Sequence, residues 1–180
     1  STENAIVYFP SCISRLMGNY EGKEKNIMET FMSVCNKATI SVIIPSNIRQ
    51  QCCSQLFGSK GYADAYRYKA NEIIDELWKS SEMGKWPVVI DVSSCAYTLK
   101  NLLPVLSEEN KKRYHQLKIW DTVEFLYHNV IPKSPNIVKQ GDIVLHPVCS
   151  LEKMNTTWML ENVARHYASN VTIPLHTGCC

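Results

Sequence analysis

The chain has 180 residues, 45% of them apolar and 20% charged, which is enough for a compact domain with a buried core. A net charge of +2 excludes a broad basic surface and argues against nucleic-acid binding, and no apolar run approaches the ~20 residues that cross a bilayer. Eight cysteines are the outstanding feature of the composition. They are too few for a small fold built on disulfides, and their clustering favours a metal or redox role in a reducing, cytoplasmic compartment.

Strand patterns and helix patterns alternate along the chain. Strands are predicted at residues 5–9, 40–44, 88–91, 143–145 and 170–174. Apolar residues at helical spacing predict helices over 27–38, 62–78, 123–130 and 155–167. Ser93 or Ser94 is placed to cap a further helix after the third strand. Strands separated by helices form βαβ units, so the fold class is predicted to be α/β with a parallel sheet.

The chain also contains an internal repeat. Residues 7–12 (VYFPSC) and 144–149 (VLHPVC) share a strand, a proline and a cysteine two positions after that proline. Each is followed by a helix, a short strand ending in proline, and a Cys-Cys pair. This order predicts two duplicated units, residues 1–131 and 137–180, joined by the polar linker 132–136, with the second unit incomplete.

Several cysteines follow the carboxyl ends of predicted strands. In a parallel sheet these ends lie at one edge, where ligands of doubly wound folds collect. We therefore expect four cysteines to converge there although they are distant in sequence: Cys12, Cys52, Cys53 and Cys95. Four thiolates without an oxygen ligand favour an iron–sulfur cluster or zinc. Cys35 lies on the apolar face of its helix and is interpreted as a core residue.

Five segments together resemble a known family. They are YFPSCISR from Tyr8, the Cys52-Cys53 pair with Ser59-Lys60-Gly61, DVSSC from Asp91, HPVC from His146, and GCC at the end of the chain. The set resembles the cysteine-rich CCG domain, which occurs in the iron–sulfur subunit of glycolate oxidase and in heterodisulfide reductase. The resemblance is greatest to the C-terminal region of FAD-linked D-lactate dehydrogenases.

The resemblance implies an electron-transfer domain of a FAD-linked 2-hydroxyacid dehydrogenase that acts on D-lactate. Its iron–sulfur cluster, of the 4Fe-4S type, is expected to relay electrons from a flavin to a downstream acceptor, and the inner face of the membrane is one location open for this relay. The flavin domain is its partner, and FAD belongs to that domain, so this chain alone is not expected to turn over substrate. Carried over, the ligands of a first site are Cys12, Cys52, Cys53 and Cys95, and those of a second are Cys149, Cys179 and Cys180.

The sequence departs from the family pattern at two positions of the first unit. Ser54 replaces the glycine after the cysteine pair, and Thr98 replaces the last cysteine of the final Cys-x-x-Cys. Two other interpretations therefore stay open. One is a zinc or thiol site with a structural or redox role, and the other is a metal-free docking domain of the same oxidoreductase.

Overall fold

The computed structural model describes residues 4–17, 25–134 and 137–174. Contacts divide the chain into two units, Ser1–Asp121 and Thr122–Cys180, and the division falls before the linker predicted at 132–136. Each unit has its own parallel sheet. The predicted α/β class is thus confirmed.

The sheet of the first unit has four parallel strands in the order β2-β1-β3-β4. The strands are β1 (Ala5–Phe9), β2 (Ser41–Ile43), β3 (Val88–Ile90) and β4 (Ile119–Asp121). Every residue of β1 and β3 is buried, as expected for inner strands of a parallel sheet covered on both faces. The carboxyl ends of β1, β2 and β3 lie at one edge, and the loops after them carry the cysteines.

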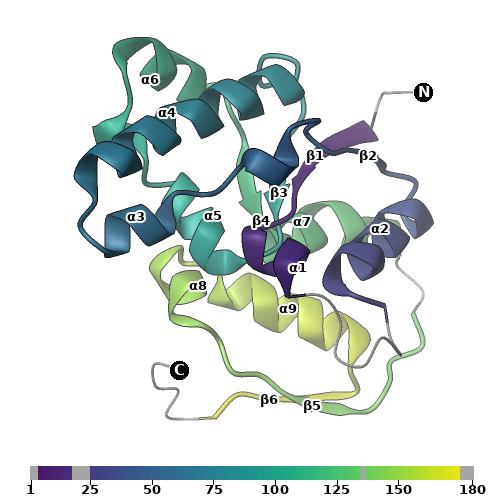
Figure 1. Ribbon diagram of the computed structural model, residues 1–180. Helices are drawn as coiled ribbons and strands as arrows, with labels where there is room; N and C mark the ends of the chain where they lie inside the picture. Colours follow the sequence, from purple (N-terminus) through teal and green to yellow (C-terminus); the bar gives the residue numbers. More distant parts are fainter. Residues whose placement is uncertain (1–3, 18–24, 135–136, 175–180) are drawn as a thin grey trace. The chain divides into compact units, whose positions relative to one another are not determined.

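Helices cover both faces of this sheet. They are α1 (Cys12–Leu16), α2 (Ile27–Lys37), α3 (Gln55–Ser59), α4 (Ala63–Ser80), α5 (Ser93–Leu99) and α6 (Glu108–Tyr114), with 3₁₀ turns at Ile48–Gln50 and Leu103–Val105. The chain moves outward from β1 to β2 and then back across β1 to β3. Right-handed crossovers therefore place α2 on one face and α4 on the other, as Figure 1 shows.

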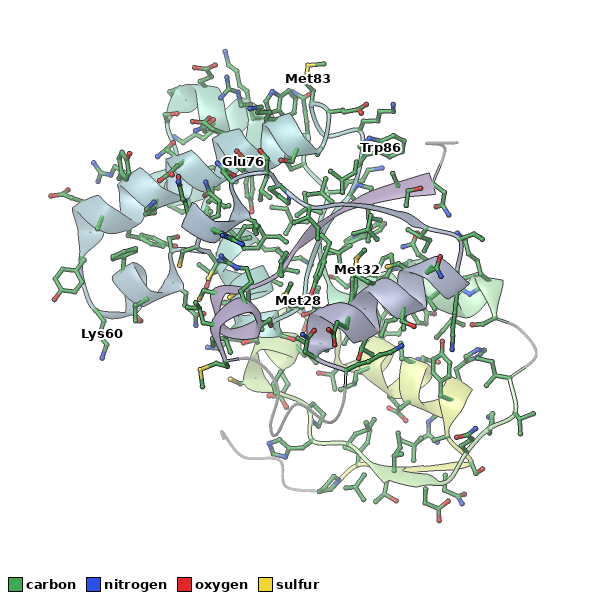
Figure 2. The ribbon with its side chains drawn as sticks, turned by 45° about the vertical axis from the view of Figure 1, so that its right-hand side comes forward. Met28, Met32, Lys60, Glu76, Met83 and Trp86 are labelled. Carbon is green, nitrogen blue, oxygen red and sulfur yellow. The ribbon has the colours of Figure 1, made fainter. Side chains whose placement is uncertain are left out.

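The long helix α4 returns the chain from the cysteine edge to the opposite edge of the sheet. Lys60 precedes this helix and Met83 follows it, and Figure 2 shows the two residues at opposite ends of α4. Its buried face carries Ile73, Ile74 and Leu77, which are fully buried. This burial fixes α4 on the sheet and hence fixes the direction from which the chain leaves the Cys52-Cys53 loop.

Two details of the first unit differ from the sequence-based expectation. Neither Ser93 nor Ser94 caps α5, because the helix begins at Ser93 and the N-cap position is Val92, which has no capping side chain. The short strand β4 was not predicted at all. Its three residues satisfy their backbone groups by pairing with β3, and a three-residue run carries too little alternation to be recognised from sequence.

The second unit repeats the β-α-α-β order that opens the first. Its elements are α7 (Thr122–Phe125), a π-helix (Leu126–Val130), a 3₁₀ turn (Ile131–Lys133), β5 (Asp142–Val144), α8 (Cys149–Lys153), α9 (Thr157–Tyr167) and β6 (Asn170–Thr172). The helices α1 and α8 both have five residues and begin at the repeated cysteine, and α2 and α9 both have eleven.

Strand pairing agrees with this repeat residue by residue. Val7 pairs with Ile43 in the first unit, and Val144 pairs with Thr172 in the second. Val7 and Val144 occupy equivalent positions in the repeat, because each stands five residues before a cysteine. Their partners Ile43 and Thr172 are also equivalent, because each stands two residues before a proline. The same register in both units gives the sequence repeat a structural counterpart.

Candidate thiol site at the carboxyl edge of the sheet

Three loops at the carboxyl edge of the first sheet carry four cysteines. Cys12 is the first residue of α1, after β1, and the side chain of Ser11 caps this helix by accepting from the Ser14 N–H. Cys95 lies in the first turn of α5, after β3. Cys52 and Cys53 lie between the turn that follows β2 and helix α3. Figure 1 shows α1 and α5 beside one another at this edge.

The four cysteines on these loops are named here the thiol cluster: Cys12, Cys52, Cys53 and Cys95. Cys53 Sγ donates to Cys95 Sγ, with the two sulfurs 3.0 Å apart. Cys12 affects the pKa of Cys52, and Cys52 affects the pKa of Cys53, so Cys12 and Cys52 lie near this pair. All four are free cysteines. Of the four cysteines expected to converge, the structure thus brings Cys53 and Cys95 into direct contact.

The cluster has an inner and an outer half. Cys53 and Cys95 are buried, each about one-twentieth exposed, whereas Cys12 and Cys52 are half-buried. Of the four cysteines, Cys12 and Cys52 are therefore the more accessible to solvent.

Contacts within the cluster change the acidity of its middle members. The hydrogen bond from Cys52 lowers the pKa of Cys53, but the hydrogen bond to Cys95 and burial together raise this pKa to about 12. The pKa of Cys52 is raised mainly because Cys52 donates to Cys53, and further by burial. Both thiols are thus protonated at neutral pH, and a metal that binds them has to displace their protons.

Asp91 fastens the loop of Cys12 to the end of β3. Its Oδ1 accepts from the Ser11 N–H at 2.8 Å, and its Oδ2 accepts from the Tyr8 hydroxyl at 2.8 Å. Tyr8 is fully buried and stacks on Phe31, with ring centroids 4.2 Å apart. Burial and the carboxylate of Asp91 raise the pKa of Tyr8, so its hydroxyl stays a donor. Both oxygens of Asp91 are therefore engaged in positioning this loop.

Arg15 fastens the loop of Cys12 to that of Cys52. Its Nε donates to the Pro10 carbonyl at 3.1 Å, and its Nη2 donates to the Gln51 carbonyl at 2.6 Å. One guanidinium thus joins Pro10, two residues before Cys12, to Gln51, the residue before Cys52. Its positive charge is permanent.

The two departures from the family pattern have visible structural consequences. Ser54 has a φ of +67°, in the left-handed region that favours glycine. This conformation directs its N–H to Cys52 Sγ at 3.4 Å, and its hydroxyl donates to the Cys53 carbonyl at 2.5 Å. Thr98, where the family has a cysteine, donates its hydroxyl to the Ser94 carbonyl of its own helix at 2.9 Å. The serine therefore keeps the glycine-type turn, and the threonine replaces the thiol by a bond within α5.

The second predicted site is described only in part. Cys149 begins α8 and is exposed, and the N-cap before it is Val148, where the first unit has the capping Ser11. Cys179 and Cys180 lie outside the described residues. The structure therefore gives no geometry for a site formed by these three cysteines.

Among the described residues, no three Cys, His, Asp or Glu side chains already have the arrangement of a metal site. No helix in the same part of the chain has the length and hydropathy needed to cross a membrane. The chain gives no significant match to protein-family models, curated proteins or solved structures.

Sequence reasoning did not predict the contacts of Asp91 and Arg15, although both residues lie in the quoted segments DVSSC and YFPSCISR. The polar contacts of Asp91 and Arg15 join segments 80 and 36 positions apart, so no local pattern reveals them. A weak signal existed for Asp91, because a carboxylate directly after an apolar strand belongs to the ligand edge of the sheet.

Proposed function

We propose that the thiol cluster binds an iron–sulfur cluster and that the chain transfers electrons within an oxidoreductase. The observation that carries this proposal is the sulfur–sulfur contact of Cys53 with Cys95, two thiols from separate loops at the ligand edge of a parallel sheet, with Cys12 and Cys52 near them. Core cysteines seldom gather in this way. A lone core cysteine, such as the fully buried Cys35, serves as the contrast within the same unit.

The chemistry of the donors fits iron and sulfide. Thiolates prefer iron–sulfur centres and zinc over hard cations. The nearest carboxylate, Asp91, has both oxygens occupied by Ser11 and Tyr8, which leaves the cysteines as the donors of this edge. When bound, an iron–sulfur cluster supplies one-electron transfer.

Residues of the chain prepare the site in three ways. Arg15 balances negative charge on the thiolates, and the Ser54 N–H stabilises charge on Cys52 Sγ. Burial of Cys53 and Cys95 keeps water from the inner half. The loops carrying the cysteines are joined by Asp91 and Arg15 before any metal binds, which lowers the entropy lost on binding.

Metal loading requires one movement. In a 4Fe-4S cluster each cysteine binds a different iron, so Cys53 and Cys95 have to leave their 3.0 Å contact when the cluster binds. The protons of Cys52 and Cys53 leave at the same time. We therefore expect loading to be slow at neutral pH and faster above pH 8.

The wider role follows from the resemblance. We infer that the chain belongs to a FAD-linked 2-hydroxyacid dehydrogenase acting on D-lactate, and that it passes electrons from the flavin domain to a downstream acceptor. In such an enzyme, a C95A change leaves reduction of the flavin by D-lactate intact and stops electron transfer to the acceptor. Flavin absorbance and acceptor reduction, followed in the same reaction, measure the two steps separately.

The direct test is anaerobic reconstitution of the chain with iron and sulfide, followed by counting both. We expect about four of each per chain at this site, with broad visible absorption. C53A and C95A abolish this binding, whereas the matched control C35A, which removes a buried cysteine outside the cluster, leaves it unchanged. C149A measures any contribution of the second unit.

Two outcomes would contradict the proposal. Iron binding that is unchanged in C53A and C95A assigns the metal to other residues. Stoichiometric zinc in a colourless chain, lost in the same variants, replaces electron transfer by a structural zinc site.

A further inference from the structure

The inner half of the thiol cluster has the geometry of a reversible dithiol. Cys53 Sγ and Cys95 Sγ are 3.0 Å apart, so a movement of about 1 Å brings them to the length of a disulfide bond. Both are buried and belong to different elements, the loop before α3 and helix α5. Oxidation here would link two segments 42 positions apart in sequence.

The outer half provides a route from solvent to this pair. Cys52 is half-buried and is the chain neighbour of Cys53, and Cys53 Sγ lies 3.0 Å from Cys95 Sγ. A disulfide between the adjacent Cys52 and Cys53 is strained and therefore easily broken by a neighbouring thiol. Cys95, whose sulfur is in contact with that of Cys53, is placed to attack the Cys53 sulfur of this strained disulfide.

We propose that the metal-free chain undergoes thiol–disulfide exchange with small-molecule disulfides, entering at Cys52 and ending in a Cys53–Cys95 disulfide. Cys52 first loses its proton to the alkaline solvent, and its sulfur then attacks a disulfide RSSR, forming a mixed disulfide and releasing one thiol RSH. Cys53 then attacks the Cys52 sulfur and releases the second RSH. Cys95 attacks the Cys53 sulfur and releases Cys52 as a thiol, so two protein thiols are oxidised and one RSSR is reduced to two RSH.

This exchange goes beyond the proposed electron transfer and does not depend on it. The oxidised inner pair has no thiolates to offer a metal, so the disulfide and metal loading exclude one another. The exchange also predicts that the chain stays competent for loading after treatment with a dithiol reductant, which returns both sulfurs to the free state.

The test uses the full metal-free chain, oxidised glutathione at pH 8.5, and trapping of free thiols by iodoacetamide. Trypsin places Cys52 and Cys53 in peptide 50–60 and Cys95 in peptide 86–100. We expect these two peptides to become cross-linked, with the loss of two free thiols per chain. In C52S the link can only involve Cys53, and we expect its formation to be at least about tenfold slower than in wild type.

C35S serves as the matched control, because Cys35 is a buried cysteine outside the thiol cluster, and it is expected to form the link at a rate within about twofold of wild type. C95S has to abolish it. Absence of the 50–60 to 86–100 link in wild type overturns the proposal, and so does a link that forms in C52S at the wild-type rate. Since no iron is present, these results are independent of iron counting. Failure of the exchange and failure of the proposed function are therefore distinguishable.

Discussion

Asp91 offers the sharpest test of how the cysteine loops are held. Asp91→Ala removes the acceptor of two hydrogen bonds, from the Tyr8 hydroxyl and the Ser11 N–H, both at 2.8 Å. Tyr8 and Ser11 are fully buried, and Asp91 is half-buried. Hydrogen bonds to a charged group contribute about 1.5–3 kcal/mol each. D91A is therefore expected to lower the free energy of unfolding by about 3–6 kcal/mol.

The assay is urea unfolding of the reduced, metal-free chain, followed by tryptophan fluorescence. Three of the four tryptophans, Trp78, Trp86 and Trp120, lie in the first unit. The matched control is Asp75→Asn, whose more than half-exposed carboxylate pairs with Arg113 on the surface. We expect this control to change the free energy of unfolding by no more than about 1 kcal/mol.

A double-mutant cycle with Tyr8→Phe separates this contact from general damage. In the wild-type background, Y8F removes one hydrogen bond and keeps the stacking on Phe31, at an expected cost of about 1–2 kcal/mol. In the D91A background, Y8F removes a buried hydroxyl that has already lost its acceptor, so it is expected to cost nothing or to restore stability. Equal costs of Y8F in the two backgrounds would refute the reasoning.

Three further predictions address other features of the first unit. Arg15→Lys keeps the charge but loses the link between the Pro10 and Gln51 carbonyls. Urea unfolding is expected to show a free energy of unfolding lower by about 1–2 kcal/mol. Peptide mapping is expected to show faster alkylation of Cys52 in the loop that Arg15 no longer holds. Because the pKa of Cys53 rises from 9.0 in the unfolded chain to about 12 in the folded one, its contribution to stability is complete below pH 9 and is lost between pH 9 and 12. C53A should flatten this part of the stability curve, and an unchanged slope would contradict the assignment. Gly84→Ala places a Cβ 2.5 Å from the Gln116 carbonyl oxygen, whereas Gly61→Ala meets nothing within 4 Å at a similar positive φ. In thermal or urea unfolding, G61A is expected to lower the free energy of unfolding by about 1 kcal/mol and G84A by about 2–4 kcal/mol. Equal losses in the two variants would show that the backbone around Gly84 shifts to accommodate the added methyl group.

The sequence alone determined the class of fold and the edge at which the cysteines gather. Local information was sufficient for this, because the apolar run of β1, the prolines after the strands and the helical spacing of α2 and α4 act within a few residues. The repeat was also visible in the sequence, and its two copies have the same register of strand pairing. Topology then brings the carboxyl ends of parallel strands together whatever the loops contain.

Only the tertiary structure decided how the site is organised. The order of the sulfurs, with Cys53 against Cys95 and Cys52 toward Cys12, depends on how three loops of different length pack, and no spacing in the sequence encodes it. The same holds for Asp91 and Arg15, whose partners come from other segments. The positive φ of Ser54 is the clearest example. A positive φ is locally unfavourable for serine. In the folded chain this conformation occurs together with two hydrogen bonds: the Ser54 N–H donates to Cys52 Sγ, and the Ser54 hydroxyl donates to the Cys53 carbonyl.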